Sequence, residues 1–71
     1  MTTRFYAQLH HHSIGQSAEH DVGDTIEEAK VNADEALGDG FQDHVICIYD
    51  RHGSVNEAVA RRRIGDEEWT D

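Results

Sequence analysis

Six histidines are the residues of this 71-residue chain whose type and spacing most readily suggest chemistry. Zinc in proteins takes three or four ligands at about 2.1 Å, and imidazole is a common one. Alternate residues of a strand share a face, so His10 and His12 are expected to point the same way, beside Glu19 of a neighbouring strand. This pattern predicts a weak metal site formed by His10, His12 and Glu19. The alternative is a solvated strand whose charge responds to pH between about 5 and 7.

Cys47 is the only cysteine, and it lies in the apolar run VICIY. A thiol in such surroundings is typical of a packed structural residue rather than a nucleophile. The sequence contains no P-loop, dinucleotide-binding glycine turn, His-Glu-x-x-His motif or nucleophile elbow. We therefore expect no enzymatic activity and no cofactor. The lone cysteine, the absence of a signal-like start and the absence of a long apolar run predict a cytoplasmic protein without membrane contact.

Acidic residues outnumber basic ones by 15 to 6, which gives a formal net charge of -9 with histidine neutral. Because proteins bind phosphate backbones through basic surfaces, we expect no direct contact with nucleic acid. The acidity is concentrated in residues 19–43, where Lys30 is the only lysine or arginine. A simple interpretation is a solvated, repulsive surface. A sharper one is an acidic helix face that binds a basic protein or imitates nucleic acid as an inhibitor. The residues of that predicted face are Glu27, Glu28, Asp34 and Glu35.

Arg61, Arg62 and Arg63 form the one basic run of the chain. We expect them to pair with the acidic surface, at about 0–1 kcal/mol for each exposed pair.

Two segments near the start predict a hairpin. Residues 4–12 and residues 18–22 alternate between apolar and polar side chains, with turn chemistry at Gly15 between them. Matching the apolar sides of the two strands places Ala7 opposite Val22.

A helix is predicted over Thr25–Leu37. Asp24 is the expected N-cap with Glu27 at the third helical position, and Gly38 is placed for a left-handed C-terminal cap. One narrow, alanine-rich stripe of the helix is apolar. Its members are Ile26, Ala29, Ala33, Ala36 and Leu37.

The β-branched run Val45–Tyr49 predicts a strand with two apolar faces. Ile46 and Ile48 point one way, whereas Val45, Cys47 and Tyr49 point the other. One helix covers only one of these faces. The sequence therefore predicts that Ile46 and Ile48 serve in sheet-face packing or in a homodimer that buries the uncovered face.

The last third of the chain has two interpretations. After a turn at residues 50–54, residues 55–64 close a second hairpin with Val59 inward, or they form a helix capped by Ser54 and Glu57. We expect Trp69 to pack the tail onto the sheet. The hairpin gives one α+β domain over residues 1–71, with order ββαββ, a four-stranded, mainly antiparallel sheet and one helix on one face. The helical alternative gives ββαβα.

The stretch GDTIEEAKVNADEAL resembles the helix entry of HicB-type antitoxins, in which a strand pair precedes an alanine-rich amphipathic helix. This resemblance implies an antitoxin-like role. The whole chain, with YDRHGSV followed by ARRRIGDE, also looks like short bacterial proteins of unknown function with a hairpin, helix, hairpin layout. That second resemblance implies a fold and no activity.

Overall fold

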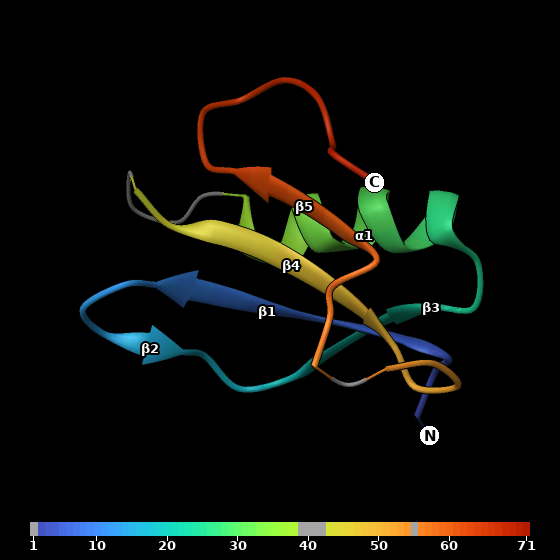
Figure 1. The fold of residues 1–71 in the computed structure, drawn as a ribbon. Coiled ribbons are helices and arrows are strands. Elements are labelled where there is room, and N and C mark those ends of the chain that lie inside the picture. The colour runs from blue at the N-terminus through green and yellow to red at the C-terminus, as the bar shows by residue number, and fades with distance from the viewer. Residues whose placement is uncertain (1, 39–42, 55) are drawn as a thin grey trace.

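The structure, a computed structural model, describes residues 2–38, 43–54 and 56–71, and within these ranges it contains one helix and five strands (Figure 1). The elements are β1 (Phe5–His11), β2 (Gly15–Gln16), β3 (His20–Gly23), α1 (Ile26–Leu37), β4 (Val45–Asp50) and β5 (Ala60–Arg63). The predicted α+β class, with a single helix packed on an antiparallel sheet, is confirmed. The predicted second strand is divided into β2 and β3, which raises the number of strands from four to five.

Strand β1 lies at the centre of the sheet. It pairs antiparallel with β4 on one side and with β2 and β3 on the other, and β5 extends the sheet beyond β4. The predicted pairing of Ala7 with Val22 is wrong, because Ala7 lies opposite His20. Ser17 accounts for the shift: its hydroxyl accepts the N–H of Leu9 at 2.8 Å, and its own N–H donates to the Leu9 carbonyl at 2.9 Å. This contact separates β2 from β3.

Helix α1 begins one residue later than predicted, since Thr25 and not Asp24 is the N-cap. The Thr25 hydroxyl accepts the N–H of Glu28 at 3.2 Å, which satisfies one of the free donors of the first turn. Asp24 instead accepts the backbone N–H of Arg4 at 2.9 Å. At the other end, Gly38 is right-handed, with φ of -66°, so the predicted left-handed cap is also wrong.

The main core lies between α1 and the sheet. Ala29 and Ala33 are fully buried, and their small side chains allow the helix to lie close to the strands. Ala36 was predicted on the same stripe but is exposed, because Leu37 packs against the main core in that turn of the helix. Ile46 and Ile48 are fully buried beneath the helix. They therefore pack the sheet face and are not available as contacts of a homodimer.

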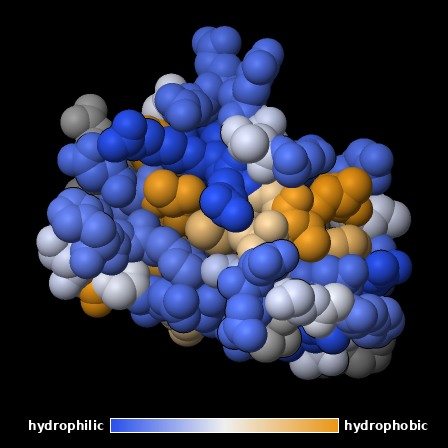
Figure 2. Space-filling model, viewed as in Figure 1, coloured by the Kyte–Doolittle hydropathy of each residue, from blue (hydrophilic) through white to orange (hydrophobic). Residues whose placement is uncertain are grey.

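The opposite face of the sheet carries a second, smaller cluster. Tyr6 and Tyr49 stack with ring centroids 5.3 Å apart, Cys47 is buried beside them, and the Arg51 guanidinium lies 4.5 Å from the Tyr6 ring centroid. The view in Figure 2 shows this face, with hydrophobic residues gathered at its centre and hydrophilic ones around them. The two-sided character predicted for β4 is confirmed. Much of its apolar surface is covered within the chain, and the homodimer stays a prediction.

The final segment forms the predicted second hairpin with β4, and not the helical alternative. Residue 55, where that hairpin was predicted to begin, lies outside the described residues. Val59 is 38% exposed rather than inward, because the register places Ala60 opposite Ile48 on the core side. Beyond β5 the chain returns, and Thr70 and Arg61 exchange two backbone hydrogen bonds of 2.8 and 2.9 Å. Trp69 packs against the main core, as predicted.

No helix within the described ranges is long and apolar enough to cross a membrane.

Candidate functional site

An open groove of about 460 Å³ lies between α1 and the C-terminal segment, residues 66–71. Its lining combines carboxylates, one lysine and two apolar side chains. The lining residues are Glu27, Lys30, Val31, Asp34, Glu35 and Trp69. Three of the four residues predicted for an acidic interaction face thus lie together along one concave surface, which we call the acidic groove.

The helix supplies the floor of the acidic groove. Glu27, Val31 and Glu35 are spaced by four residues, so they share one stripe of the helix surface. Val31 is 59% exposed although it is apolar and β-branched. An exposed apolar side chain between two carboxylates gives a binding molecule apolar surface to bury beside two negative charges.

The other wall of the acidic groove is the C-terminal segment, which Arg62 and Lys30 hold in place. The Arg62 guanidinium lies 5.4 Å from the Trp69 ring centroid, donates to the Asp34 carboxylate, and donates to the Asp66 carbonyl at 2.7 Å. Lys30 forms an ion pair with the Asp71 side chain at 2.8 Å. The tail wall is therefore held by cation–π, ionic and backbone contacts together.

These internal contacts decide which charges are available to a ligand. Asp34 is already paired with Arg62, and Lys30 is paired with Asp71. Glu27 and Glu35 form no ion pair with any residue in the described part of the chain, and both are exposed. The free negative charge of the acidic groove is therefore at Glu27 and Glu35, on either side of Val31.

Glu28, the fourth residue of the predicted acidic face, lies elsewhere. Its carboxylate lies over Gly23 at the end of β3, and its backbone N–H is the donor to the Thr25 cap. Gly23 has φ of +136°, a conformation that favours glycine, and a Cβ there would meet the Glu28 carboxylate. Asp39, part of the acidic stretch, lies outside the described residues.

The predicted pairing of the arginine run with the acidic surface holds for two of its members. Arg62 pairs with Asp34, and Arg63 with Asp43 at 3.4 Å. Arg61 forms no ion pair within the described ranges and lies opposite Cys47 on the second sheet face.

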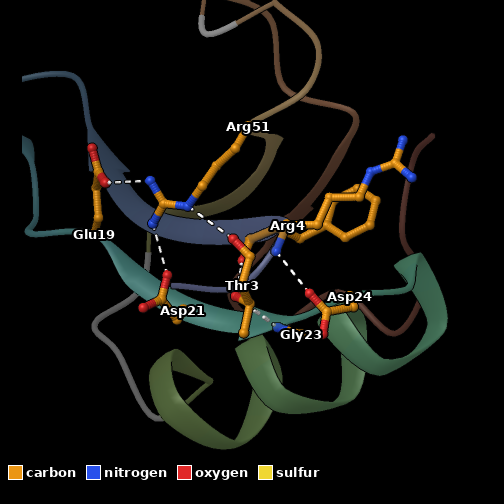
Figure 3. A network of polar contacts seen from close by, with 8 residues as sticks. Thr3, Arg4, Glu19, Asp21, Gly23, Asp24 and Arg51 are labelled. Atoms are coloured by element: carbon orange, nitrogen blue, oxygen red, sulfur yellow. Dashed lines mark hydrogen bonds and ion pairs between the residues drawn. The ribbon is translucent and has the colours of Figure 1, made fainter. Parts of the chain in front are cut away.

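His10, His12 and Glu19, the predicted metal ligands, have different partners in the structure. His10 Nε2 lies 3.1 Å from the Tyr49 hydroxyl. Glu19 pairs with Arg51 at 3.3 Å, in a network that also joins Arg51 to Asp21 and to the Thr3 carbonyl (Figure 3). Among the described residues, no group of three or more histidine, cysteine, aspartate or glutamate side chains is arranged to hold a metal ion.

His12 instead belongs to a row of imidazoles. The His11 ring centroid lies 4.4 Å from that of His12 and 4.6 Å from that of His44. His11 Nδ1 accepts the backbone N–H of Ser13 at 3.1 Å, within the turn that joins β1 to β2. Burial lowers the pKa of His11, the neighbouring His12 and His44 lower it further, and Asp43 opposes them. Burial also lowers the pKa of His10.

Cys47 has the surroundings predicted for a structural thiol. Burial raises its pKa above the ordinary value, although Arg61 opposes this effect. The thiol therefore stays protonated near neutral pH, the form that is least nucleophilic.

Sequence reasoning identified the carboxylates of the acidic groove but not the groove itself. The signal for its apolar part was Val31, a single apolar residue on the otherwise polar side of the helix. The position of Lys30 beneath the tail depends on how the C-terminal segment returns, which no local pattern specifies. Comparison with protein-family models, with curated proteins and with solved structures finds no match for this chain.

Proposed function

We propose that this chain is a protein-interaction module whose acidic groove binds a basic segment of a partner protein. The observation that carries the proposal is the exposed Val31 between the unpaired carboxylates of Glu27 and Glu35. An apolar floor supplies contact area, and the two carboxylates select for positive charge on the ligand.

The net charge of -9 acts in the same direction. A field of this sign attracts basic partners over a distance set by the Debye length, about 8 Å at physiological ionic strength, and repels anionic ones. Each exposed ion pair contributes about 0–1 kcal/mol, so the contact is weak and sensitive to salt.

An inhibitor that imitates nucleic acid is the competing interpretation of the acidity. A mimic of phosphates needs an array of charges and has no use for an apolar floor. In the groove lining, Val31 and Trp69 lie beside only two unpaired carboxylates, and this combination favours recognition of a peptide segment. An antitoxin would be one case of this function, with a basic toxin as the partner.

Trp69 is the only tryptophan in the chain and lines the acidic groove, so its fluorescence reports binding there directly. We expect a basic peptide without aromatic residues to shift Trp69 emission in a saturable manner at about 0.01 M salt, and more weakly at about 0.15 M. An acidic peptide of equal length should have no effect. Equal responses to the two peptides, or no response to the basic one, would refute the proposal.

Single charge removals test the location. Glu35→Gln should weaken binding of the basic peptide, whereas Glu57→Gln, an equal loss of charge at an exposed position outside the groove lining, should change it much less. Equal effects would mean that net charge alone attracts the peptide.

Self-association through the uncovered sheet face and a cytoplasmic location remain part of the proposal. Two valines near this face offer apolar surface to a second copy. They are Val59, which is exposed just before β5, and the partly buried Val45 of β4. Sedimentation equilibrium that returns only monomer at millimolar concentration would exclude the homodimer without affecting the groove.

A further inference from the structure

We propose that the segment bound in the acidic groove is extended and has the pattern basic–x–apolar–x–basic. This inference rests on the function proposed above and specifies the conformation and the side-chain pattern of the ligand.

The spacing of the helix stripe determines the pattern. Glu27 and Glu35 are eight residues apart, which is about 12 Å along the helix axis at a rise of about 1.5 Å per residue. Val31 lies midway between them. In an extended chain, residues i and i+4 are about 13 Å apart, and residues i, i+2 and i+4 point to the same face. Two cations with one apolar residue between them therefore match the three positions of the stripe.

The one lysine that lines the acidic groove determines the centre of the pattern. Lys30, next to Val31 in sequence, also lines the groove and is held by Asp71. A ligand cation placed over Val31 would therefore face a like charge, whereas cations at the two ends meet Glu27 and Glu35. An apolar residue at the centre avoids the repulsion and covers Val31.

The C-terminal wall favours an extended ligand. Thr70 exchanges two backbone hydrogen bonds with Arg61. In an extended chain, the backbone N–H and C=O groups of successive residues point to opposite sides. The backbone groups of Trp69, next to Thr70, form no hydrogen bond with any described residue. An extended segment could pair with this free edge while its side chains lie over α1, which is recognition by addition of a strand.

A helical ligand fits this wall less well. Its backbone groups are satisfied internally, so it could not use the free edge at Trp69. Helical ligands are thus the alternative that the experiment below must distinguish.

The test uses Trp69 fluorescence with four terminally blocked peptides that contain no aromatic residue. The first is Arg-Ser-Val-Ser-Arg and the second is its isomer Arg-Arg-Ser-Ser-Val. The other two are the first peptide with one backbone N-methyl group, at valine in one and at the serine after it in the other. We expect the first peptide to bind at least about fivefold more tightly than the isomer. One of the two N-methylated forms should lose binding and the other should retain it, because alternate N–H groups point to opposite sides of a strand.

A matched pair of variants tests the apolar position. Val31→Thr should weaken binding of the first peptide severalfold and reduce its advantage over the isomer. Val59→Thr, the same change at another exposed valine, should leave both affinities unchanged. Both sites are exposed, so neither variant is expected to affect folding.

The outcomes separate the two proposals. Equal affinity for the two isomers would overturn the pattern while leaving binding of basic segments intact. Full binding by both N-methylated forms would overturn the extended pairing. If neither isomer nor a longer mixed peptide of lysine and arginine changes Trp69 fluorescence, the proposed function itself fails.

Discussion

His11 connects protonation to the first hairpin of the sheet. Its Nδ1 accepts the Ser13 N–H, and its ring lies between those of His12 and His44. Protonation at Nδ1 removes the acceptor and adds a charge beside two other imidazoles. Strand alternation in the sequence points to His10 and His12, whereas the contacts make His11, between those two positions, the most crowded imidazole.

The lowered pKa of His11 and of His10 predicts a loss of stability in weak acid. The unfolded chain, with an ordinary histidine pKa of about 6.5, binds protons more readily than the folded one in this range. The free energy of unfolding should therefore be highest above about pH 6.5 and fall as the pH drops below it. Urea unfolding at a series of pH values measures this change. His11→Gln should flatten the profile, and an unchanged profile in that variant would exclude His11 as a source.

A second residue-scale prediction concerns Asp50. The Arg4 side chain, followed by the His52 backbone N–H, lowers the pKa of the Asp50 carboxyl to about 2. This contribution to stability is present above the ordinary value of 3.8 and is lost as the pH falls towards about 2. NMR titration of the carboxyl carbon should give the low pKa in the wild type, and Arg4→Gln should raise it. A pKa near 3.8 in both proteins would contradict the contact.

At the scale of the elements, the N-terminal cap of α1 is the clearest test of the helix boundary. Thr25→Ala removes the hydroxyl that accepts the Glu28 N–H and should cost about 1 kcal/mol of stability. Thr2→Ala, at an exposed threonine before β1, is the matched control and should be neutral. Chemical unfolding followed by circular dichroism measures both, and equal stability of the two variants would refute the assignment of the cap.

The close approach of α1 to the sheet gives another prediction. Ala33 is fully buried whereas Ala36 is exposed, and both are alanines of the same helix. Ala33→Leu should destabilise the protein by about 1–3 kcal/mol, because the larger side chain forces the helix away from the strands. Ala36→Leu should stay within about 0.5 kcal/mol of the wild type. The reverse order would mean that the helix packs with a different face.

Much of this level of structure follows from sequence patterns, and the errors have local causes. The helix follows from its apolar periodicity, and the two faces of β4 follow from a continuous apolar run. The N-cap was misplaced by one residue because Asp24 and Thr25 are both good caps, and a long-range bond from Arg4 decides between them. The register of the first hairpin depends on the Ser17 hydroxyl, which alternation of apolar residues does not reveal.

At the scale of the whole molecule, the candidate site depends on contacts between distant segments. Glu27 and Glu35 could be found from the helix pattern, but the groove exists only because residues 66–71 return to β5 and place Trp69 beside α1. That return is held by Arg62, which contacts Trp69 and also reaches Asp34, 28 residues away in the sequence. Lys30 holds it through Asp71, 41 residues away. Spacing within one element cannot predict such a wall.

The most direct test of the central claim is to map where a basic segment binds. Two-dimensional ¹H–¹⁵N NMR spectra of labelled protein, recorded as Arg-Ser-Val-Ser-Arg is added, report on each backbone amide. We expect the perturbed amides to cluster at residues 27–35 of α1 and at residues 66–71, with little change around Tyr6 and Tyr49 on the opposite sheet face. Perturbations centred on that opposite face, or spread evenly over the acidic surface, would contradict binding in the acidic groove.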